Sequence, residues 1–391
     1  MRDEMKKVPR LRFRGFQEDW ELCKLGELIE SFDSERIPID SSLRISGQYP
    51  YYGATGIIDY IDSYIFDGEY VLLAEDGANI IMRNYPVAYL TQGKFWLNNH
   101  AHIMRMVKGD NQFLVQILEK MNYSKYNTGT AQPKLNSNIV KRINLRVPIP
   151  EEQQKIGTIF KQLDDTITLH QRKLEQLKEL KTAYLQVMFP AKDERVPKLR
   201  FAAFEDDWKL CKLGSILEER NEQMAENNEY YLMSFVQGKG VTPKGDRYDR
   251  SFLVKDEKKK YKKTEFGDFI YSSNNLERGS IGFNRTGKAL ISPVYSIFKS
   301  KNQLESQFIG ILSERKSFIN RMTKFRQGVV YGQWRIHESD FLNVEVRVPS
   351  HMEQKGIIKF FSNLDNMIII HQNKLNQLKA LKKAYLQNMF I

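Results

Sequence analysis

The feature that most constrains this 391-residue chain is an internal duplication. The segment 8–26, VPRLRFRGFQEDWELCKLG, returns at 196–214 as VPKLRFAAFEDDWKLCKLG, with 13 identities in 19 positions. A second segment, 163–189, returns at 364–390 with 18 identities in 27 positions. The two offsets, 188 and 201 residues, differ by 13, so the second copy has 13 more residues between its repeated segments, and the sequences there share almost nothing. The chain therefore consists of two tandem halves, each with a fixed opening, a divergent middle and a fixed tail.

The two fixed tails predict long amphipathic helices. Neither contains Pro or Gly, and Lys, Gln, Leu and Glu fill most of their other positions. Seam residues recur at alternating steps of four and three, as in a coiled coil. A long helix with an apolar seam must bury that seam, and the simplest partner is the seam of the other tail. The two helices would pack antiparallel within the chain or between two chains. The predicted seam residues are Leu163, Ile167, His170, Leu174, Leu177, Lys181, Tyr184 and Met188, and then Leu364, Ile368, His371, Leu375, Leu378, Lys382, Tyr385 and Met389.

Polar residues interrupt this seam at equivalent places in the two tails, with His170 and Lys181 in the first. Polar groups in a coiled-coil core lower stability but fix alignment. We hypothesise that they set the register of the helix pair. The duplication also predicts pseudo-twofold symmetry, which would bring Met1 near Ile391.

Each divergent middle predicts a small α+β domain built on a twisted, partly antiparallel sheet. Runs of β-branched and aromatic residues are punctuated by Gly and Asp, which is typical of short strands and tight turns. We expect strands within 49–60, 63–75, 80–89, 93–103, 230–236, 268–272, 281–285 and 290–298, and helices over 111–121 and 307–322.

Proline-rich entries precede both tails, at 147–156 and 348–357. Pro is tolerated at the start of a helix, so these segments mark where sheet or loop gives way to helix. We divide the chain into a first globular domain, 1–146, a helical region with linker, 147–195, a second globular domain, 196–347, and a second helical region, 348–391.

Composition narrows the class of protein. Hydrophobic residues make up 41% and charged residues 28%, an ordinary globular mix. The chain has no run of 18 apolar residues, and its N-terminal segment is too polar for a secretory signal, so we expect a cytoplasmic protein with no membrane contact. Two cysteines cannot form a disulfide framework or a four-cysteine zinc site. A formal charge of +12 favours a polyanionic partner.

The sequence lacks the motifs of the expected catalytic chemistries. It has no Asn/Asp-Pro-Pro-aromatic motif of an adenine methyltransferase and no GxxxxGK[ST] loop for nucleotide hydrolysis. His100 and His102 could share a strand face as metal ligands, but no partner ligands stand at convincing spacing, so we favour histidines that hydrogen-bond in the core or face DNA. Glu75 and Asp76, before Gly77, are most simply acidic turn residues.

The whole arrangement resembles the specificity (S) subunit of type I restriction-modification systems. The resemblance rests on the repeated W…LG block, the segment TGTAQPKLNSNIVKRINLRVPIPEEQQKI and the helices that end LKTAYLQVMF and LKKAYLQNMF, and it covers essentially the whole chain. One departure is that 129–133, GTAQP, corresponds to 330–334, VYGQW, where only the glutamine matches.

This resemblance implies two target recognition domains that read the two halves of a bipartite site in double-stranded DNA, separated by two antiparallel coiled-coil helices. It implies two modification (methyltransferase) subunits and restriction (translocase/nuclease) subunits as partners. S-adenosylmethionine and ATP would be bound by those partners and no cofactor by this chain, which would be non-catalytic. About 27 helical residues would span about 40 Å, or about 12 base pairs of duplex. The alternatives are a coiled-coil scaffold with two protein-binding domains and a free-standing methyltransferase or nuclease.

We expect DNA contacts from polar side chains in loops and at strand ends. Asn suits adenine and Arg suits guanine through paired hydrogen bonds, and Lys and Arg meet phosphates. The glycine-rich basic loop 238–247 fits a solvated hairpin equally well, and the basic run 255–263 favours phosphate or solvent over bases. The candidates are Asn79, Lys94, Asn98, Asn99, Gln132 and Lys134 in the first half, and Lys239, Lys244, Arg247, Asn274, Asn275, Arg278, Arg326, Gln327, Gln333 and Arg335 in the second.

Overall fold

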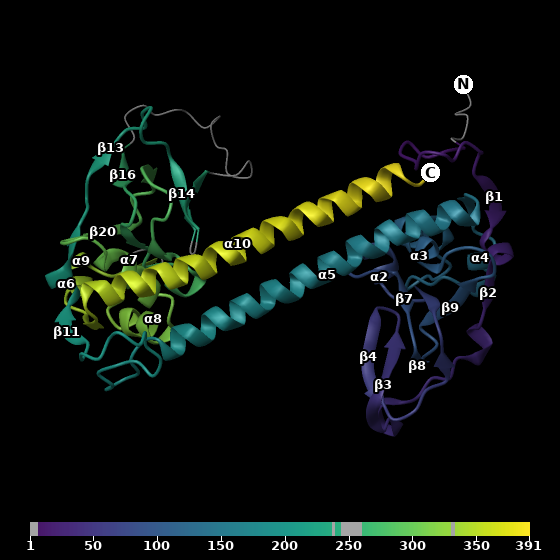
Figure 1. Ribbon diagram of the computed structural model, residues 1–391, viewed down its shortest axis with the longest axis horizontal. Coiled ribbons are helices and arrows are strands. Elements are labelled where there is room, and N and C mark those ends of the chain that lie inside the picture. The colour runs from purple at the N-terminus through teal and green to yellow at the C-terminus, as the bar shows by residue number, and fades with distance from the viewer. Residues whose placement is uncertain (1–6, 237–238, 244–259, 330–332) are drawn as a thin grey trace. The chain divides into compact units, whose positions relative to one another are not determined.

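The computed structural model describes residues 7–236, 239–243, 260–329 and 333–391 (Figure 1). Contacts divide the chain into two compact units. Unit 1 comprises Met1–Gln171 and Asn373–Ile391, and unit 2 comprises Arg172–Gln372. Each unit therefore joins the opening and middle of one half to parts of both tails.

Unit 1 contains two four-stranded sheets. In the first, all neighbouring strands are antiparallel, in the order β2-β9-β6-β7, and helix α3 packs against it. In the second, with the order β4-β3-β8-β5, the β3–β8 pair is parallel. The elements are β2 (Ile29–Ser31), η1 (Asp33–Glu35), η2 (Ser41–Leu43), β3 (Ser46–Gly53), β4 (Gly56–Ile61), β5 (Phe66–Asp67), β6 (Tyr70–Ala74), α2 (Asn79–Met82), β7 (Ala88–Thr91), β8 (Lys94–Leu97), β9 (Ala101–Met106), α3 (Asn111–Lys120) and η3 (Ser124–Tyr126).

Unit 2 repeats the first of these sheets as β12-β20-β17-β18, again with antiparallel neighbours, and helix α7 packs against it. Apart from the β11–β23 pair described below, its other strands form a three-stranded sheet, β13-β16-β19, and two antiparallel pairs, β14-β15 and β21-β22. The elements are β12 (Leu217–Glu219), β13 (Gln223–Met224), β14 (Met233–Val236), β15 (Gly240–Pro243), β16 (Tyr261–Thr264), β17 (Phe269–Tyr271), η5 (Leu276–Arg278), β18 (Ile281–Phe283), β19 (Ala289–Ile291), β20 (Ser296–Ser300), α7 (Glu305–Leu312), α8 (Lys316–Thr323), β21 (Gln327–Val329) and β22 (Gln333–Arg335).

The register of the two equivalent sheets identifies which residues correspond. Leu73 lies opposite His102 in unit 1, and Tyr271 lies opposite Ser296 in unit 2. Each pair lies at the end of its sheet where β6 or β17 ends and the following loop begins. Counting from this register, the equivalent residues are His102 and Ser296, Asp76 and Asn274, and His100 and Val294.

A small antiparallel sheet and two short helices recur in each unit and flank the divergent middle. The sheets β1–β10 and β11–β23 have the same register, with Cys23 opposite Leu145 and Cys211 opposite Val346. The elements are β1 (Glu21–Lys24), α1 (Leu25–Leu28), α4 (Ser137–Lys141) and β10 (Asn144–Val147) in unit 1, and β11 (Lys209–Lys212), α6 (Leu213–Ile216), α9 (Glu338–Leu342) and β23 (Glu345–Val348) in unit 2.

The tails form two helices of 38 residues each, α5 (Pro150–Val187) and α10 (His351–Asn388). Each begins thirteen residues before the predicted seam, at the proline-rich entry. The helices contact each other within each unit. Asp164 of α5 accepts from Lys382 of α10 at 2.6 Å in unit 1, and Lys181 of α5 donates to Asp365 of α10 at 2.6 Å in unit 2. Residue numbers rise along one helix as they fall along the other, so the pair is antiparallel, as predicted.

The opening of each half packs on the end of the other half's tail. The Leu11 N–H donates to the Asn388 carbonyl at 2.8 Å, and the Leu199 N–H donates to the Val187 carbonyl at 2.9 Å. Residues close to both chain ends therefore meet in unit 1, as the duplication predicts, although Met1 itself lies outside the described residues. The repeated opening, tail and sheet confirm the predicted fold class, an internally duplicated α+β protein with two antiparallel coiled-coil helices.

Two local predictions were wrong. The predicted strand 80–89 begins instead with the helical turn α2, because the Asn79 amide accepts from the Tyr85 N–H at 2.8 Å and donates to the Tyr85 carbonyl at 3.0 Å. The predicted helix 307–322 is two helices, α7 and α8. The break follows Ser313, whose hydroxyl donates to the Gly310 carbonyl at 2.7 Å and competes with the helical pattern.

Candidate nucleic-acid interface

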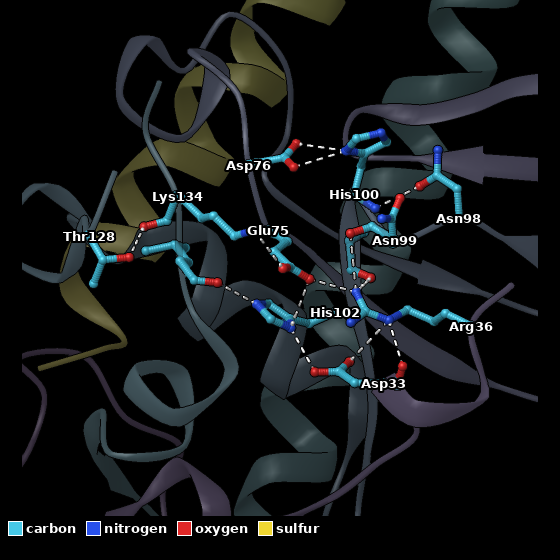
Figure 2. Close-up of polar contacts among 12 residues, drawn as sticks. Asp33, Arg36, Glu75, Asp76, Asn98, Asn99, His100, His102, Thr128 and Lys134 are labelled. Atoms are coloured by element: carbon cyan, nitrogen blue, oxygen red, sulfur yellow. Dashed lines mark hydrogen bonds and ion pairs between the residues drawn. The ribbon is translucent and has the colours of Figure 1, made fainter. Parts of the chain in front are cut away.

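In unit 1, a polar cluster lies where the central strands β6 and β9 meet the loops (Figure 2). His102, 1% exposed, has Nδ1 2.8 Å from Asp33 and Nε2 2.7 Å from the Leu135 carbonyl. Both ring nitrogens thus face hydrogen-bond acceptors. Arg36 donates to Glu75 at 2.6 Å and to the Ala101 carbonyl at 2.8 Å. The buried charges are therefore paired.

Electrostatics at Asp33 reflect this arrangement. Burial raises the pKa of the Asp33 carboxyl. The hydrogen bond and charge of His102, the Ile103 N–H and the Arg36 guanidinium together outweigh burial and lower that pKa to about 2. Asp33 is therefore ionised at neutral pH, and its carboxylate positions His102 and the Ile103 backbone within the cluster.

The segment 127–135 is fastened to the acidic turn at 75–77. The Leu135 N–H donates to the Glu75 carbonyl at 2.7 Å, and the Gly77 N–H donates to the Pro133 carbonyl at 3.0 Å. Lys134 Nζ lies 3.5 Å from Glu75 Oε1. Two predicted contact residues, Gln132 and Lys134, are thereby held at the surface with exposed side chains.

The turn between β8 and β9 carries two more predicted residues. Asn98 is only 5% exposed, and its Oδ1 accepts from the His100 N–H at 2.9 Å. Asn99 is exposed, and its carbonyl accepts from Arg36 at 3.4 Å. Within this turn, Asn98 supports the backbone while Asn99 reaches solvent.

Two other candidates of the first half are not part of this cluster. The Asn79 amide closes the loop after α2 through its two hydrogen bonds to the Tyr85 backbone, which gives it a structural role. Lys94 begins β8, and its Nζ lies 4.6 Å from the centre of the Tyr64 ring. The hydrogen bond to Tyr64 raises the pKa of Lys94, so this exposed side chain keeps its charge.

Unit 2 places neutral groups where unit 1 has acids. Ser273 Oγ accepts from the Ile336 N–H at 3.0 Å, and Asn274 Oδ1 accepts from the Trp334 N–H at 2.6 Å. Trp334 is 48% exposed. The loop after β17 thus holds the segment around 333–336, just as the loop after β6 holds 127–135 in unit 1. Leu135 and Ile336, which follow the unlike sequences GTAQP and VYGQW, are each bound through their N–H by the loop after the equivalent central strand.

Several candidates of the second half already have protein partners. Arg326 forms a bidentate pair with Glu277 at 2.6 and 2.7 Å, so its charge is neutralised. Arg335 lies 3.9 Å from Glu338, and Gln327 donates to Asp340 at 3.5 Å. Asn275, Arg278 and Lys239 have exposed side chains, Gln333 lies in β22, and Lys244 and Arg247 lie outside the described residues.

Sequence reasoning missed the supporting groups Asp33, Arg36, Ser273 and Glu277. Arg36 and its partner Glu75 are 39 residues apart, and no motif or spacing in the sequence indicates that they form a pair. Glu277 lies 49 residues from Arg326, but its position beside the predicted Asn274, Asn275 and Arg278 was a signal that the basic side chains near it could be paired.

The described residues contain no group of three or more His, Cys, Asp and Glu that could hold a metal ion. The histidines of the first middle hydrogen-bond to carboxylates instead, one in the core and one at the surface. Among the helices within the described ranges, none is long and apolar enough to cross a membrane.

The structure thus builds one frame twice, with a different polar surface in each copy. The family model described as "Type I restriction modification DNA specificity domain" matches residues 17–179 and again 205–380. The chain belongs to this family, and it carries two such domains.

Curated relatives align over most of their length. A putative type I restriction enzyme specificity subunit from Haemophilus influenzae is 26% identical over 373 residues, covering 90% of this chain and 89% of the relative. The MjaVIII specificity subunit from Methanocaldococcus jannaschii is 23% identical, covering 94% and 91%. The crystal structure of a type I restriction-modification S subunit from M. genitalium has the same fold, with a TM-score of 0.72, 14% identity and coverage of 98% and 99%.

Proposed function

We propose that this chain is the sequence-specific DNA-binding subunit of a type I restriction-modification complex. Unit 1 reads one part of a bipartite target in double-stranded DNA, and unit 2 reads the other. The carrying observation is that equivalent backbone positions hold Asp76, His100 and His102 in unit 1 but Asn274, Val294 and Ser296 in unit 2.

The chemistry of these surfaces supports reading by hydrogen bonds. A reader of an asymmetric target needs different side chains against each part, while the surfaces that bind repeated partners stay alike. In unit 1, the side chains of Asn99, Gln132 and Lys134 are exposed, and the ion pairs beneath them, Arg36–Glu75 and His102–Asp33, are largely buried. In unit 2, the positions equivalent to Glu75 and Asp76 carry the neutral residues Ser273 and Asn274, and Asn274 accepts from the Trp334 N–H.

The helix pair is proposed as the spacer between the two parts of the target. Each helix is continuous over 38 residues and contributes to both units. Lysines at equivalent seam positions, Lys181 and Lys382, each donate to an aspartate of the other helix at 2.6 Å. Such pairs favour one register over its neighbours, as proposed for the seam.

Partners and localisation complete the proposal. The relatives are named specificity subunits, and the fixed openings and tails offer repeated surfaces on which two modification subunits could dock, with restriction subunits joining them. Those partners would bind S-adenosylmethionine and ATP and carry out catalysis, while this chain binds no cofactor and acts in the cytoplasm.

The test is a titration of labelled duplex DNA with the purified chain in low and moderate salt. If about eight phosphates are contacted, the logarithm of the affinity should fall against the logarithm of the salt concentration with a slope near −7. A protein-binding scaffold should show no specific duplex binding at either salt concentration. The chain alone, incubated with DNA and labelled S-adenosylmethionine, should transfer no methyl groups, whereas transfer by the chain alone would show a free-standing methyltransferase.

A further inference from the structure

The turn between β8 and β9 of unit 1 holds an exposed histidine in a fixed place. The His100 side chain is 53% exposed. Its N–H donates to Asn98 Oδ1 at 2.9 Å, and its carbonyl accepts from the Glu75 N–H at 2.9 Å. Asn98 is buried and donates its own N–H to the Tyr52 carbonyl at 3.1 Å. The backbone that carries the ring is therefore tied to the folded core on both sides.

The ring of His100 is oriented as well. Its Nδ1 lies 2.9 and 3.0 Å from the two carboxylate oxygens of Asp76. The carboxylate can only accept, so Nδ1 carries the proton and donates it. Figure 2 shows that Nε2 lies on the ring edge turned away from Asp76. The pair thus presents one defined polar atom outward.

Asp76 is itself held by its neighbours. It forms a β-bridge with Lys134, and the next residue, Gly77, donates its N–H to the Pro133 carbonyl at 3.0 Å. Gly77 has φ +107°, which a side chain would disfavour, so the glycine permits this turn. A side chain ordered before binding loses less freedom when it meets a ligand.

We propose that His100 reads one base of the part recognised by unit 1, through Nε2, and that Asp76 is its positioning residue. The inference rests on the proposed function. In the neutral ring, Nε2 accepts from the exocyclic amino group of adenine or cytosine, and in the protonated ring it donates to N7 or O6 of guanine.

The contact belongs to unit 1 alone. The residues of unit 2 equivalent to Asp76 and His100 are Asn274 and Val294, and a valine side chain can neither donate nor accept a hydrogen bond. Lys134, whose exposed Nζ lies beside the same turn, supplies a positive charge suited to a neighbouring phosphate. The two units would therefore differ at this point in the kind of base edge that they recognise.

The experiment uses the full chain assembled with its modification subunits and a duplex library in which the target positions are randomised. Methylated molecules are sequenced, and the base preference is calculated at each position. H100A should reduce the preference at one position by about 5- to 100-fold and leave the other positions unchanged. D76A should reduce the preference at the same position, whereas D76N keeps an oxygen acceptor for Nδ1–H and should retain most of it.

R105A is the matched control, because Arg105 is also exposed in unit 1 but pairs with Glu30 at 2.7 Å. It should leave every preference unchanged. An unchanged profile for H100A, or an equal loss of methylation on all sequences, would overturn the inference, since the second result indicates a phosphate contact or a structural role. A wild-type complex with no sequence preference would instead contradict the proposed function.

Discussion

The seam lysines occupy equivalent positions in the duplicated tails but have different surroundings. Lys181 Nζ lies 2.6 Å from Asp365 and 2.5 Å from Glu314, and these three side chains are 12%, 7% and 12% exposed. Arg285 completes the cluster, 2.8 Å from Asp365. Burial raises the pKa of Glu314, while the charges of Lys181 and Arg285 act in the opposite direction. In unit 1, Lys382 and Asp164 form a pair that is 24% and 34% exposed.

Replacing each lysine with methionine keeps most of the side-chain volume and removes the charge. K181M leaves two buried carboxylates with one cation and should cost about 3–5 kcal/mol, as for a broken buried pair. K382M breaks a partly exposed pair and should cost at most about 1 kcal/mol. Since about 1.4 kcal/mol is a factor of ten, K181M should speed amide hydrogen exchange in 172–187 and 351–372 about a hundredfold or more. K382M should speed exchange in 150–171 and 373–388 no more than about fivefold.

A double variant separates charge from packing. K181M/E314Q removes one of the two carboxylates and leaves Asp365 paired with Arg285, so it should recover more than half of the protection lost in K181M. Equal losses in K181M and K382M, or no recovery in the double variant, would refute the reasoning from buried charge.

Two further perturbations test unit 1 and the packing of the long helices. The pKa of Asp33 is lowered to about 2 from 3.8, so its ionised form stabilises unit 1 above pH 4, and this contribution of about 2 kcal/mol is lost as the pH falls towards 2. The difference in unfolding free energy between wild type and D33N should shrink by that amount over this range, and a constant difference would contradict the assignment. G157A would drive a methyl group into the Asp110 carboxylate that caps α3, and should cost about 1–3 kcal/mol in urea unfolding despite the better helix propensity of alanine. G356A meets only the Phe201 ring, at 3.2 Å, and should be neutral or stabilising, so equal effects of the two variants would be the contrary result.

Much of the fold could be predicted from the sequence, because duplication and seam spacing are properties of sequence alone. The repeated blocks located both copies of the frame, and the period of apolar residues identified α5 and α10. The seam did not reveal that these helices begin at Pro150 and His351. Their first turns pack against the units through residues such as Phe160, which is fully buried, and so do not follow the seam pattern.

The surface was harder to predict, because its residues are supported from distant parts of the chain. The predicted Gln132 and Lys134 do meet the acidic turn, whereas Arg326 proved to be neutralised by Glu277. The segments 129–133 and 330–334 share only a glutamine, yet the N–H groups of Leu135 and Ile336, which follow them, are bound by the loops after equivalent strands. Backbone groups and short polar side chains fasten the next residues of each segment to the loops after β6 and β17. Backbone groups are the same in every residue except proline, so hydrogen bonds to the backbone could not be predicted from the residue types.

The most direct measurement is a map of methylated bases in DNA from cells that carry this chain and its modification subunits. We predict a motif in two separated parts, with substitutions at Asn274 altering the preference in one part and substitutions at His100 altering it in the other. A contiguous motif, or a substitution in one unit that changes both parts alike, would contradict the account.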